Sequence, residues 1–280
     1  MACVRLPEFV ERHNVSAAEA LGVRELRVLG RGVSSEVVLA VEKSSPEGKK
    51  KALKKIVYGE RESLADKLKR WSFFLNEVNI LKELSHPNII ELQRALSCRE
   101  ELVLVLELHV SDLASALPHV TDFGVIRFFT QSTSALTYLH QRRIVHGDVK
   151  PQNVLLHHTG KMVRLCDFGF AQRLPENKKS CNTYSGTPAY LGPEFTTGQP
   201  VQDVYKLESF ALGRLLCSLL FREKAKLNVD YLPLIRENAT IPATMKECAQ
   251  RLLEPSPTER ATAWQIDQFL TQTSPGAPSN

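Results

Sequence analysis

The first third of the chain combines strand-like segments with one long helix. Apolar and polar residues alternate over short stretches, which is typical of half-buried strands. On this basis we predict strands at 25–29, 36–42, 52–57 and 101–109. From Arg61 to Leu84 the apolar residues recur instead at spacings of three and four. That period predicts one main amphipathic helix in this part of the chain.

The remainder of the chain has a helical pattern. Periodic apolar segments predict helices at 123–141, 208–221, 245–253 and 263–272. Two short strands are predicted around a turn, and a polar, irregular loop follows them; these lie at 153–156, 162–166 and 177–193. A strand-rich first part followed by a helix-rich part predicts an α+β enzyme with two lobes.

The same pattern predicts how the chain is divided. Residues 1–23 form a leader with a helical patch at 16–21, and residues 24–109 form an N-terminal lobe. Residues 110–272 form a larger C-terminal lobe, and residues 273–280, TSPGAPSN, have the composition of a disordered tail.

Length and composition agree with a folded enzyme. A chain of 280 residues suits two packed lobes or one large enzyme domain, and a hydrophobic fraction of 43% supports a sizeable core. The formal net charge is +5, but positive and negative residues are mixed along the chain. This indicates a mildly basic surface rather than a nucleic-acid footprint, so we expect no nucleic-acid partner.

Several features bear on the compartment. The six cysteines show no CxxC or zinc-like spacing, which is typical of reduced thiols in an intracellular protein. The N-terminal sequence has no continuous apolar core of a signal peptide, and no run reaches the roughly 18 apolar residues of a membrane span. Ala2 excludes N-myristoylation. We expect a protein of the cytoplasm, the nucleus or both, without a membrane partner.

A glycine-containing turn lies between the first two predicted strands. It runs from Leu29 to Val37 and contains Gly30 and Gly32. Glycine lets backbone amides approach phosphate oxygens closely. The strand–turn–strand setting disfavours a dinucleotide site, where such a motif opens a helix. A plain hairpin with two glycines explains the segment equally well.

Lys54 and Glu77 are candidates for an ion pair. Lys54 alternates with apolar neighbours on a predicted strand, and Glu77 lies on the predicted main helix. Each residue taken alone is explained as an exposed surface charge. Taken together, the glutamate would align the lysine on the α- and β-phosphates of a nucleotide.

The most specific motif is IVHGDVKPQNVLL, which is followed by LCDFG. Phosphoryl transfer to a hydroxyl group requires a carboxylate for the hydroxyl proton, oxygen ligands for Mg²⁺, and positive charge near the moving phosphoryl group. Asp148 supplies the first, Asn153 and Asp167 supply the second, and Lys150 supplies the third. Aspartate and asparagine are common in turns, but this order and spacing are far more specific than that.

With these motifs the chain resembles the protein kinase family over residues 26–270. The resemblance implies the two-lobed protein kinase fold, with a small antiparallel sheet and one main helix in the N-lobe and a larger, mostly helical C-lobe. It also implies ATP and Mg²⁺ as cofactors, protein substrates, and regulatory protein partners.

The resemblance assigns roles residue by residue. Asp148 and Lys150 match the catalytic residues, and Asn153 and Asp167 match the metal ligands. The positions that match the nucleotide-binding residues are Leu29, Gly30, Gly32, Val37, Ala52, Lys54, Glu77, Leu106, Glu107, His109 and Leu155.

Within that set, Ala52 and Leu155 match the residues on either side of adenine. Leu106 falls at the gatekeeper position, and Glu107 and His109 offer backbone groups of the hinge.

A further segment concerns the protein substrate. GTPAYLGPE, residues 186–194, resembles the segment that seats the substrate peptide, and Arg260 matches the arginine that pairs with Glu194. We call residues 186–194 the seating segment. Lys150 and Thr187 are typical of serine/threonine kinases. The catalytic loop is most similar to those of NF-kappaB-inducing kinase and related MAP kinase kinase kinases.

Four positions depart from the family pattern. Gly147 replaces the arginine that grips a phosphate on the activation loop, which favours activity without phosphorylation of that loop. The sites available there are Ser180, Thr183, Tyr184 and Ser185. Ser35 replaces the third glycine of the phosphate loop, and Gly192 replaces an alanine, which we expect to be a small change. Glu208 stands where the buried helix is expected to begin with aspartate, so anchoring of the catalytic loop is in question.

Other functions are compatible with parts of the sequence. An ATP-binding pseudokinase that serves as a scaffold is the alternative from another class, but such proteins commonly lack at least one of the catalytic positions. A small-molecule kinase on the same fold is disfavoured by the seating segment. The sequence therefore favours an active serine/threonine protein kinase.

Overall fold

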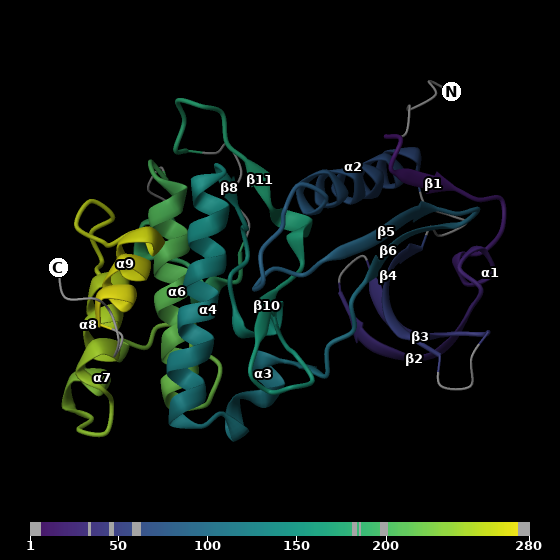
Figure 1. The fold of residues 1–280 in the computed structure, drawn as a ribbon. Coiled ribbons are helices and arrows are strands. Elements are labelled where there is room, and N and C mark those ends of the chain that lie inside the picture. Colours follow the sequence, from purple (N-terminus) through teal and green to yellow (C-terminus); the bar gives the residue numbers. More distant parts are fainter. Residues whose placement is uncertain are drawn as a thin grey trace. The chain divides into compact units, whose positions relative to one another are not determined.

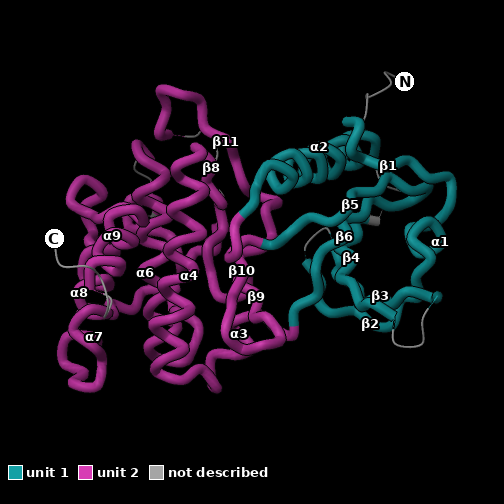
Figure 2. Tube along the Cα trace, viewed as in Figure 1, with its two compact units in different colours: residues 1–85, 90–109 teal, residues 86–89, 110–280 magenta. Residues whose placement is uncertain are grey.

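The computed structural model describes residues 7–32, 35–44, 48–57, 63–180, 184, 186–196 and 201–273. The chain divides into two compact units (Figure 2). The first comprises residues 1–85 and 90–109, and the second comprises residues 86–89 and 110–280.

The described part of the first unit contains one sheet of six strands, in the order β1-β5-β6-β4-β3-β2 (Figure 1). Its strands are β1 (Val10–Arg12), β2 (Val23–Arg31), β3 (Glu36–Glu42), β4 (Lys50–Val57), β5 (Leu92–Ser97) and β6 (Glu101–Leu106). All neighbours run antiparallel except β1 and β5, which pair in parallel from Val10↔Ala95 to Arg12↔Ser97. Part of the predicted leader therefore adds a strand to the sheet.

The two faces of this sheet are covered by different helices. On one face, Leu53, Val103 and Val105 pack with Ala17 of the short helix α1 (Ala17–Ala20), which is the predicted helical patch. Successive strand residues point to opposite faces, so Lys54 points away from α1. The other face meets α2 (Leu64–Leu81), the predicted main helix, which contacts β5 and β6.

The described part of the second unit contains two small antiparallel sheets, β10-β9-β7 and β11-β8. Their strands are β7 (Ser111–Asp112), β8 (Ile144–Val145), β9 (Val154–Leu156), β10 (Val163–Leu165) and β11 (Gln172–Arg173). Short 3-10 turns connect them to the helices: η1 (Leu117–His119), η2 (Pro151–Asn153), η3 (Phe168–Phe170) and η4 (Pro188–Tyr190).

Helices form the bulk of the second unit. They are α3 (Leu113–Ala116), α4 (Asp122–Gln141), α5 (Pro193–Thr196), α6 (Val204–Phe221), α7 (Tyr231–Glu237), α8 (Ala243–Leu252) and α9 (Ala263–Thr273). The long helices α4 and α6 pack side by side (Figure 1). Helix α6 is mostly apolar and is buried along nearly its whole length, and the charged residues Glu208 and Arg214 are buried with it. No helix within the described ranges is both long and apolar enough to cross a membrane.

Some predicted elements differ from the structure. The helix predicted at 208–221 begins at Val204, because Asp203 caps it by accepting hydrogen bonds from the N–H groups of Tyr205 and Lys206 at 3.0 and 3.3 Å. The strand predicted at 101–109 ends at Leu106. Helix α7 lies in a stretch whose short, mixed pattern predicted no helix.

Candidate active site

Asp148 lies at the centre of a hydrogen-bond network in the second unit. Its Oδ1 accepts from the backbone N–H and the hydroxyl of Thr187, at 3.1 and 2.8 Å. Its Oδ2 accepts from Lys150 Nζ at 2.6 Å and from Asn153 Nδ2 at 3.0 Å. Lys150 Nζ also donates to the Thr187 hydroxyl at 2.8 Å. The structure thus brings three of the predicted site residues together with Thr187.

The backbone around Asp148 is fixed by His146, which is fully buried. Its Nε2 lies 2.9 Å from the carbonyl of Cys166, and the N–H of Asp148 lies 3.3 Å from its Nδ1. Because a carbonyl can only accept and an N–H can only donate, Nε2 donates and Nδ1 accepts. The ring also packs edge-on against Phe168, with centroids 4.9 Å apart. This side chain therefore connects the catalytic loop with the LCDFG segment.

Asn153 and Asp167 lie at the same end of the β9–β10 hairpin. Val154 pairs with Leu165 across the hairpin, and the N–H of Cys166 donates to the carbonyl of Asn153 at 2.8 Å. The Asn153 amide nitrogen donates to the carbonyl of Asp148 at 2.8 Å as well as to its carboxylate. Asp167 has left-handed backbone angles, φ 64° and ψ 72°. Asparagine and aspartate are among the residues that tolerate this conformation.

Glu208 anchors the catalytic loop from inside α6. Its side chain is fully buried; Oε1 accepts the N–H of Gly147 at 2.5 Å, and Oε2 lies 2.8 Å from His140 Nε2. The sequence placed Glu208 at the start of the helix, where it would accept from helical amides. That placement is wrong, because Asp203 fills the capping position. The anchoring that this replacement put in question is nevertheless present.

Gly147 has a backbone conformation that favours glycine. Its φ is +84°, and a Cβ atom added there would lie 2.6 Å from the carbonyl oxygen of Phe170. A side chain at this position would therefore meet both backbone strain and a fixed backbone atom.

The predicted ion pair is present in the first unit. Lys54 Nζ donates to both carboxylate oxygens of Glu77, at 2.7 and 2.8 Å. The exposed fractions of the two side chains are only 11% and 4%. Loss of one partner of such a buried pair is strongly destabilising, because the remaining buried charge loses the opposite charge that compensates it.

The register of the sheet aligns four of the other predicted residues of the first unit. Gly30 on β2 pairs with Val37 on β3, Val37 pairs with Lys54 on β4, and Ala52 pairs with Leu106 on β6. These positions form two neighbouring rows across four strands.

The rest of the predicted nucleotide-binding set is spread over both units. Leu29 lies on β2 and is 37% exposed, and the N–H of Gly32 donates to the carbonyl of Ser35 at 2.7 Å. The tip of that turn, 33–34, lies outside the described residues.

The predicted hinge and adenine positions follow these strands. Glu107 and His109 lie just beyond β6, and Glu107 Oε1 accepts from the N–H of Glu91 at 3.2 Å. Leu155 lies on β9 of the second unit, where it pairs with Arg164.

Arg260 holds the end of the seating segment. Its guanidinium group is fully buried and forms a two-pronged pair with Glu194, at 2.6 and 3.0 Å, as predicted. Gly192 has a role that the sequence did not reveal. A Cβ atom there would lie 2.5 Å from Glu194 Oε2, so the replacement of alanine is not the small change that we expected.

The Protein kinase domain family model matches residues 23–270. The chain belongs to the protein kinase family. Its α+β architecture, with a sheet-containing N-lobe and a helical C-lobe, is that of the family. The fold predicted from the motifs is thereby confirmed.

Relatives of this kinase carry serine/threonine-protein kinase and related names. NUAK family SNF1-like kinase 1 of Mus musculus is 28% identical over 269 residues, covering 92% of this chain and 40% of the relative. CBL-interacting protein kinase 4 of Oryza sativa subsp. japonica is 37% identical over 210 residues, covering 71% and 44%. Probable serine/threonine-protein kinase fhkE of Dictyostelium discoideum is 33% identical over 204 residues, covering 69% and 28%. The chain thus spans less than half the length of these relatives.

Sequence reasoning missed two contributors to the kinase's site. The sequence marks Thr187 only as typical of serine/threonine kinases, although its side chain contacts both Asp148 and Lys150. Arg214 lies in the segment 208–221, for which the pattern predicts only an apolar helix, yet its buried guanidinium group reaches the seating segment. A charged residue inside an apolar helix was the available signal, because such a residue is rarely buried without partners.

Proposed function

We propose that this chain transfers the γ-phosphoryl group of ATP to serine or threonine hydroxyl groups of proteins. The observation that carries the proposal is the Thr187 hydroxyl, which donates to Asp148 at 2.8 Å and accepts from Lys150 at 2.8 Å. A hydroxyl group held between a carboxylate and an ammonium group has the surroundings that a phosphoryl acceptor needs.

In the proposed reaction, Asp148 accepts the proton of the substrate hydroxyl. The hydroxyl oxygen then forms a bond to the γ-phosphorus, the bond from that phosphorus to the ADP oxygen breaks, and ADP leaves. Lys150, 2.6 Å from Asp148, offsets negative charge on the transferred group. Asn153 holds the Asp148 carboxylate through its amide nitrogen.

The first unit supplies all of the proposed nucleotide-binding residues except Leu155, which lies in the second unit. Lys54, aligned by Glu77, would bind the α- and β-phosphates, and the backbone near Gly30 and Gly32 would cover them. Ala52 and Leu155 are proposed to enclose adenine, Leu106 is the proposed gatekeeper, and Glu107 and His109 offer the hinge backbone. Leu29 and Val37 complete the proposed set on the strands that flank the glycine turn. The sheet register, which aligns Ala52 with Leu106, supports this assignment.

Asn153 and Asp167 fit the requirements of a Mg²⁺ site. Both lie at one end of the β9–β10 hairpin, and both side chains carry oxygen atoms, which this hard cation prefers. The Asn153 amide nitrogen makes the two hydrogen bonds to Asp148, which leaves the amide oxygen for another partner. When bound, Mg²⁺ supplies charge neutralisation for the phosphates.

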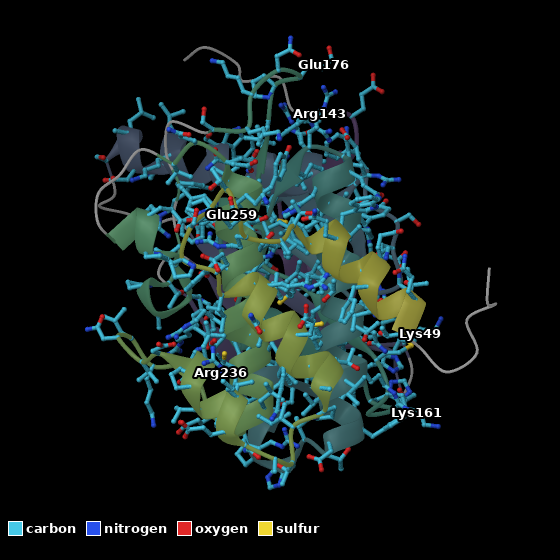
Figure 3. All side chains as sticks on the ribbon, turned by 90° about the vertical axis from the view of Figure 1, so that its left-hand side faces the viewer. Lys49, Arg143, Lys161, Glu176, Arg236 and Glu259 are labelled. Carbon is cyan, nitrogen blue, oxygen red and sulfur yellow. The ribbon has the colours of Figure 1, made fainter. Side chains whose placement is uncertain are left out.

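We also propose that activity does not require phosphorylation of the activation loop. Strand β11 pairs with β8, and the N–H of Leu174 donates to the carbonyl of Arg143 at 2.7 Å. Arg143 also pairs with Glu176 at 3.0 Å, and both residues are labelled in Figure 3. That pair is exposed and contributes at most about 1 kcal/mol. The β11–β8 pairing and the bond from Leu174 to Arg143 hold the start of the activation loop without a phosphate group, which supports the proposal.

The candidate phosphorylation sites provide the test of this second proposal. Ser180 is exposed, and Tyr184 packs edge-on against Phe195 with ring centroids 6.0 Å apart. The other two, Thr183 and Ser185, lie outside the described residues. We expect the variant with alanine at the three serine and threonine positions and phenylalanine at Tyr184 to keep phosphotransfer. Loss of activity in that variant, with folding unchanged, would contradict the proposal.

A direct assay tests the kinase proposal. The purified chain is incubated with Mg-ATP and a generic protein substrate, beside Asp148→Asn, and phosphoserine and phosphothreonine are measured by mass spectrometry. We expect phosphotransfer from the wild type and a loss of at least about a hundredfold in the variant. Equal signals from both proteins would refute it. Thermal stabilisation by ATP without turnover would favour a pseudokinase scaffold.

The cysteines bear on the cellular setting of the chain. Cys98, Cys166, Cys217 and Cys248 are free thiols, and burial raises the pKa of Cys217 and of Cys248 to about 12. We propose a signalling kinase of the cytoplasm or nucleus that is controlled by protein partners. Fractionation of cells and mass spectrometry of proteins cross-linked to the chain would test both points. Recovery only with secreted or membrane fractions would contradict them.

A further inference from the structure

Arg214 connects α6 to the seating segment. Its Nε donates to the carbonyl of Ala189 at 2.8 Å, and its Nη1 donates to the carbonyl of Val229 at 2.8 Å. Its Nη2 donates to the carbonyl of Lys226. One side chain thus holds the segment between α6 and α7 against the seating segment.

The guanidinium group of Arg214 donates to backbone carbonyls. Arg214 is only 6% exposed, and its guanidinium group donates to three carbonyl groups and lies over the face of the Tyr231 ring, 4.8 Å from the ring centroid. Buried arginine is commonly paired with a carboxylate. In Arg214 the N–H groups of the planar guanidinium group point instead at three backbone carbonyls, so the interaction depends on direction as well as on charge. Lysine, which has a single ammonium group, cannot reproduce that arrangement.

A second set of bonds fixes the next residue of the seating segment. The Tyr190 hydroxyl lies 3.3 Å from Ser218 Oγ, and the N–H of Ala225 donates to both oxygens at 3.3 and 3.0 Å. Ser218 Oγ also lies 3.0 Å from the carbonyl of Arg214. Burial raises the pKa of Tyr190, so the hydroxyl stays protonated and can donate.

These contacts lie one turn from the phosphoryl acceptor site. Ala189 and Tyr190 belong to η4, which begins directly after Thr187. The N–H of Tyr190 donates to the carbonyl of Thr187 at 2.8 Å. Since Thr187 donates to Asp148, a shift of Ala189 would move the group that contacts the proposed catalytic base.

We propose that Arg214 is a positioning residue for the protein substrate. It fixes Ala189 and Tyr190, and through η4 it fixes Thr187 on Asp148, so that the seating segment keeps its working geometry without a phosphate group. The inference rests on the proposed kinase function and assigns a role to a residue outside the catalytic motifs. The alternative is a purely structural role, in which Arg214 only stabilises the connection from α6 to α7.

Kinetics separate the two explanations. Arg214→Met and Arg214→Lys are compared with wild type, using a serine peptide that the wild type phosphorylates. For Arg214→Met we expect the KM for the peptide to rise about tenfold or more, because a hydrogen bond from a charged donor is lost. The KM for ATP stays within about twofold. For Arg214→Lys we expect a KM for the peptide between those of wild type and Arg214→Met.

Arg222→Lys is the matched control. Arg222 follows the same helix, donates to the carbonyl of Leu219 and pairs with Asp122, but it has no described contact with the seating segment. We expect its peptide KM to match that of wild type. An equal rise in peptide KM for Arg214→Lys and Arg222→Lys would overturn the proposal. It would also be overturned if the Arg214 variants showed only a fall in kcat that matches their loss of folded protein.

Hydrogen exchange gives a readout that does not depend on activity. In Arg214→Met we expect faster exchange at the amides of Thr187 and Tyr190, with exchange in α4 unchanged. Tyr190→Phe should act in the same direction with a smaller effect. Unchanged exchange in the seating segment would overturn the inference even if the kinase is active. An inactive wild type with this exchange response would instead count against the proposed function alone.

Discussion

Glu208 and Gly147 are 61 residues apart in the chain, yet the carboxylate of Glu208 accepts the backbone N–H of Gly147 at 2.5 Å. Gly147 precedes Asp148, so this bond fixes the backbone next to the proposed catalytic base. The same carboxylate contacts His140 on α4. One buried side chain therefore ties α4, α6 and the catalytic loop together.

Replacement of Glu208 tests this anchor. Glu208→Ala would leave the N–H of Gly147 buried without an acceptor, and we expect the free energy of unfolding to fall by about 2–4 kcal/mol. Glu208→Gln keeps an oxygen that can accept the same N–H, so its loss should be clearly smaller. Urea denaturation of both variants measures the difference. Equal destabilisation would show that the hydrogen bond to Gly147 is not what matters.

Gly147 itself should resist substitution. For Gly147→Ala we expect a loss of about 1–2 kcal/mol from the left-handed backbone, and a further loss from the contact with Phe170. Gly160→Ala is the matched control, because Gly160 has φ +65° but open space around its Cα. Denaturation should show the larger loss at position 147. Similar losses at both positions would mean that Phe170 moves aside at little cost.

Lys54 and Glu77 allow stability to be separated from activity. Lys54→Met removes the positive charge that compensates the buried carboxylate of Glu77, and we expect a loss of about 3–5 kcal/mol in unfolding free energy together with loss of phosphotransfer. The double variant Lys54→Met with Glu77→Leu should regain much of the stability but none of the activity. Denaturation and a peptide kinase assay measure the two effects. Activity in the double variant would contradict the proposed role of Lys54.

Gly192→Ala should weaken the seating segment through Glu194. The added Cβ would meet a carboxylate that Arg260 holds in place, and we expect a loss of about 1–3 kcal/mol from overpacking. In the background Glu194→Ala, the same substitution should cost much less, since the crowded atoms are gone. A double-mutant cycle by denaturation measures this coupling. Additive losses would contradict the contact.

Asp267 predicts a pH dependence of stability. Burial raises the pKa of its carboxyl group above the ordinary value of 3.8, so the folded state favours the protonated form. Below pH 3.8 the carboxyl group is protonated in both the folded and the unfolded state, and its burial carries no charge penalty. As the pH rises through the raised pKa of the folded state, the group must be buried in its charged form, and the folded state loses stability. Asp267→Asn should therefore raise Tm at pH 7 and have little effect at pH 3.

The exposed residue Glu259, labelled in Figure 3, supplies the control. Glu259→Gln should show no such gain in Tm at pH 7. If Asp267→Asn is no more stable than wild type at pH 7, or if its gain persists unchanged at pH 3, the interpretation of Asp267 is wrong.

The sequence by itself determined the kinase fold and most of the candidate residues. A strand-like alternation predicted β3 and β4, and apolar residues at spacings of three and four predicted α2. These spacings identified the elements, because the residues on the buried face of a strand or helix recur at its period. The local motif around Asp148, Lys150 and Asn153 was readable because those residues act within one short loop. The Lys54–Glu77 and Glu194–Arg260 pairs were both predicted, the second from the resemblance alone, and both are present.

Only the tertiary structure decided which distant groups meet. A period reports that a face is buried but does not name what covers it. Strand β1 has three residues, too few for a period, and it pairs with β5 far along the chain. Helix α6 looked uniformly apolar, so neither the reach of Arg214 to Ala189 nor that of Glu208 to Gly147 was encoded locally. Those contacts exist because close packing leaves buried charged groups no water and requires each to find a partner.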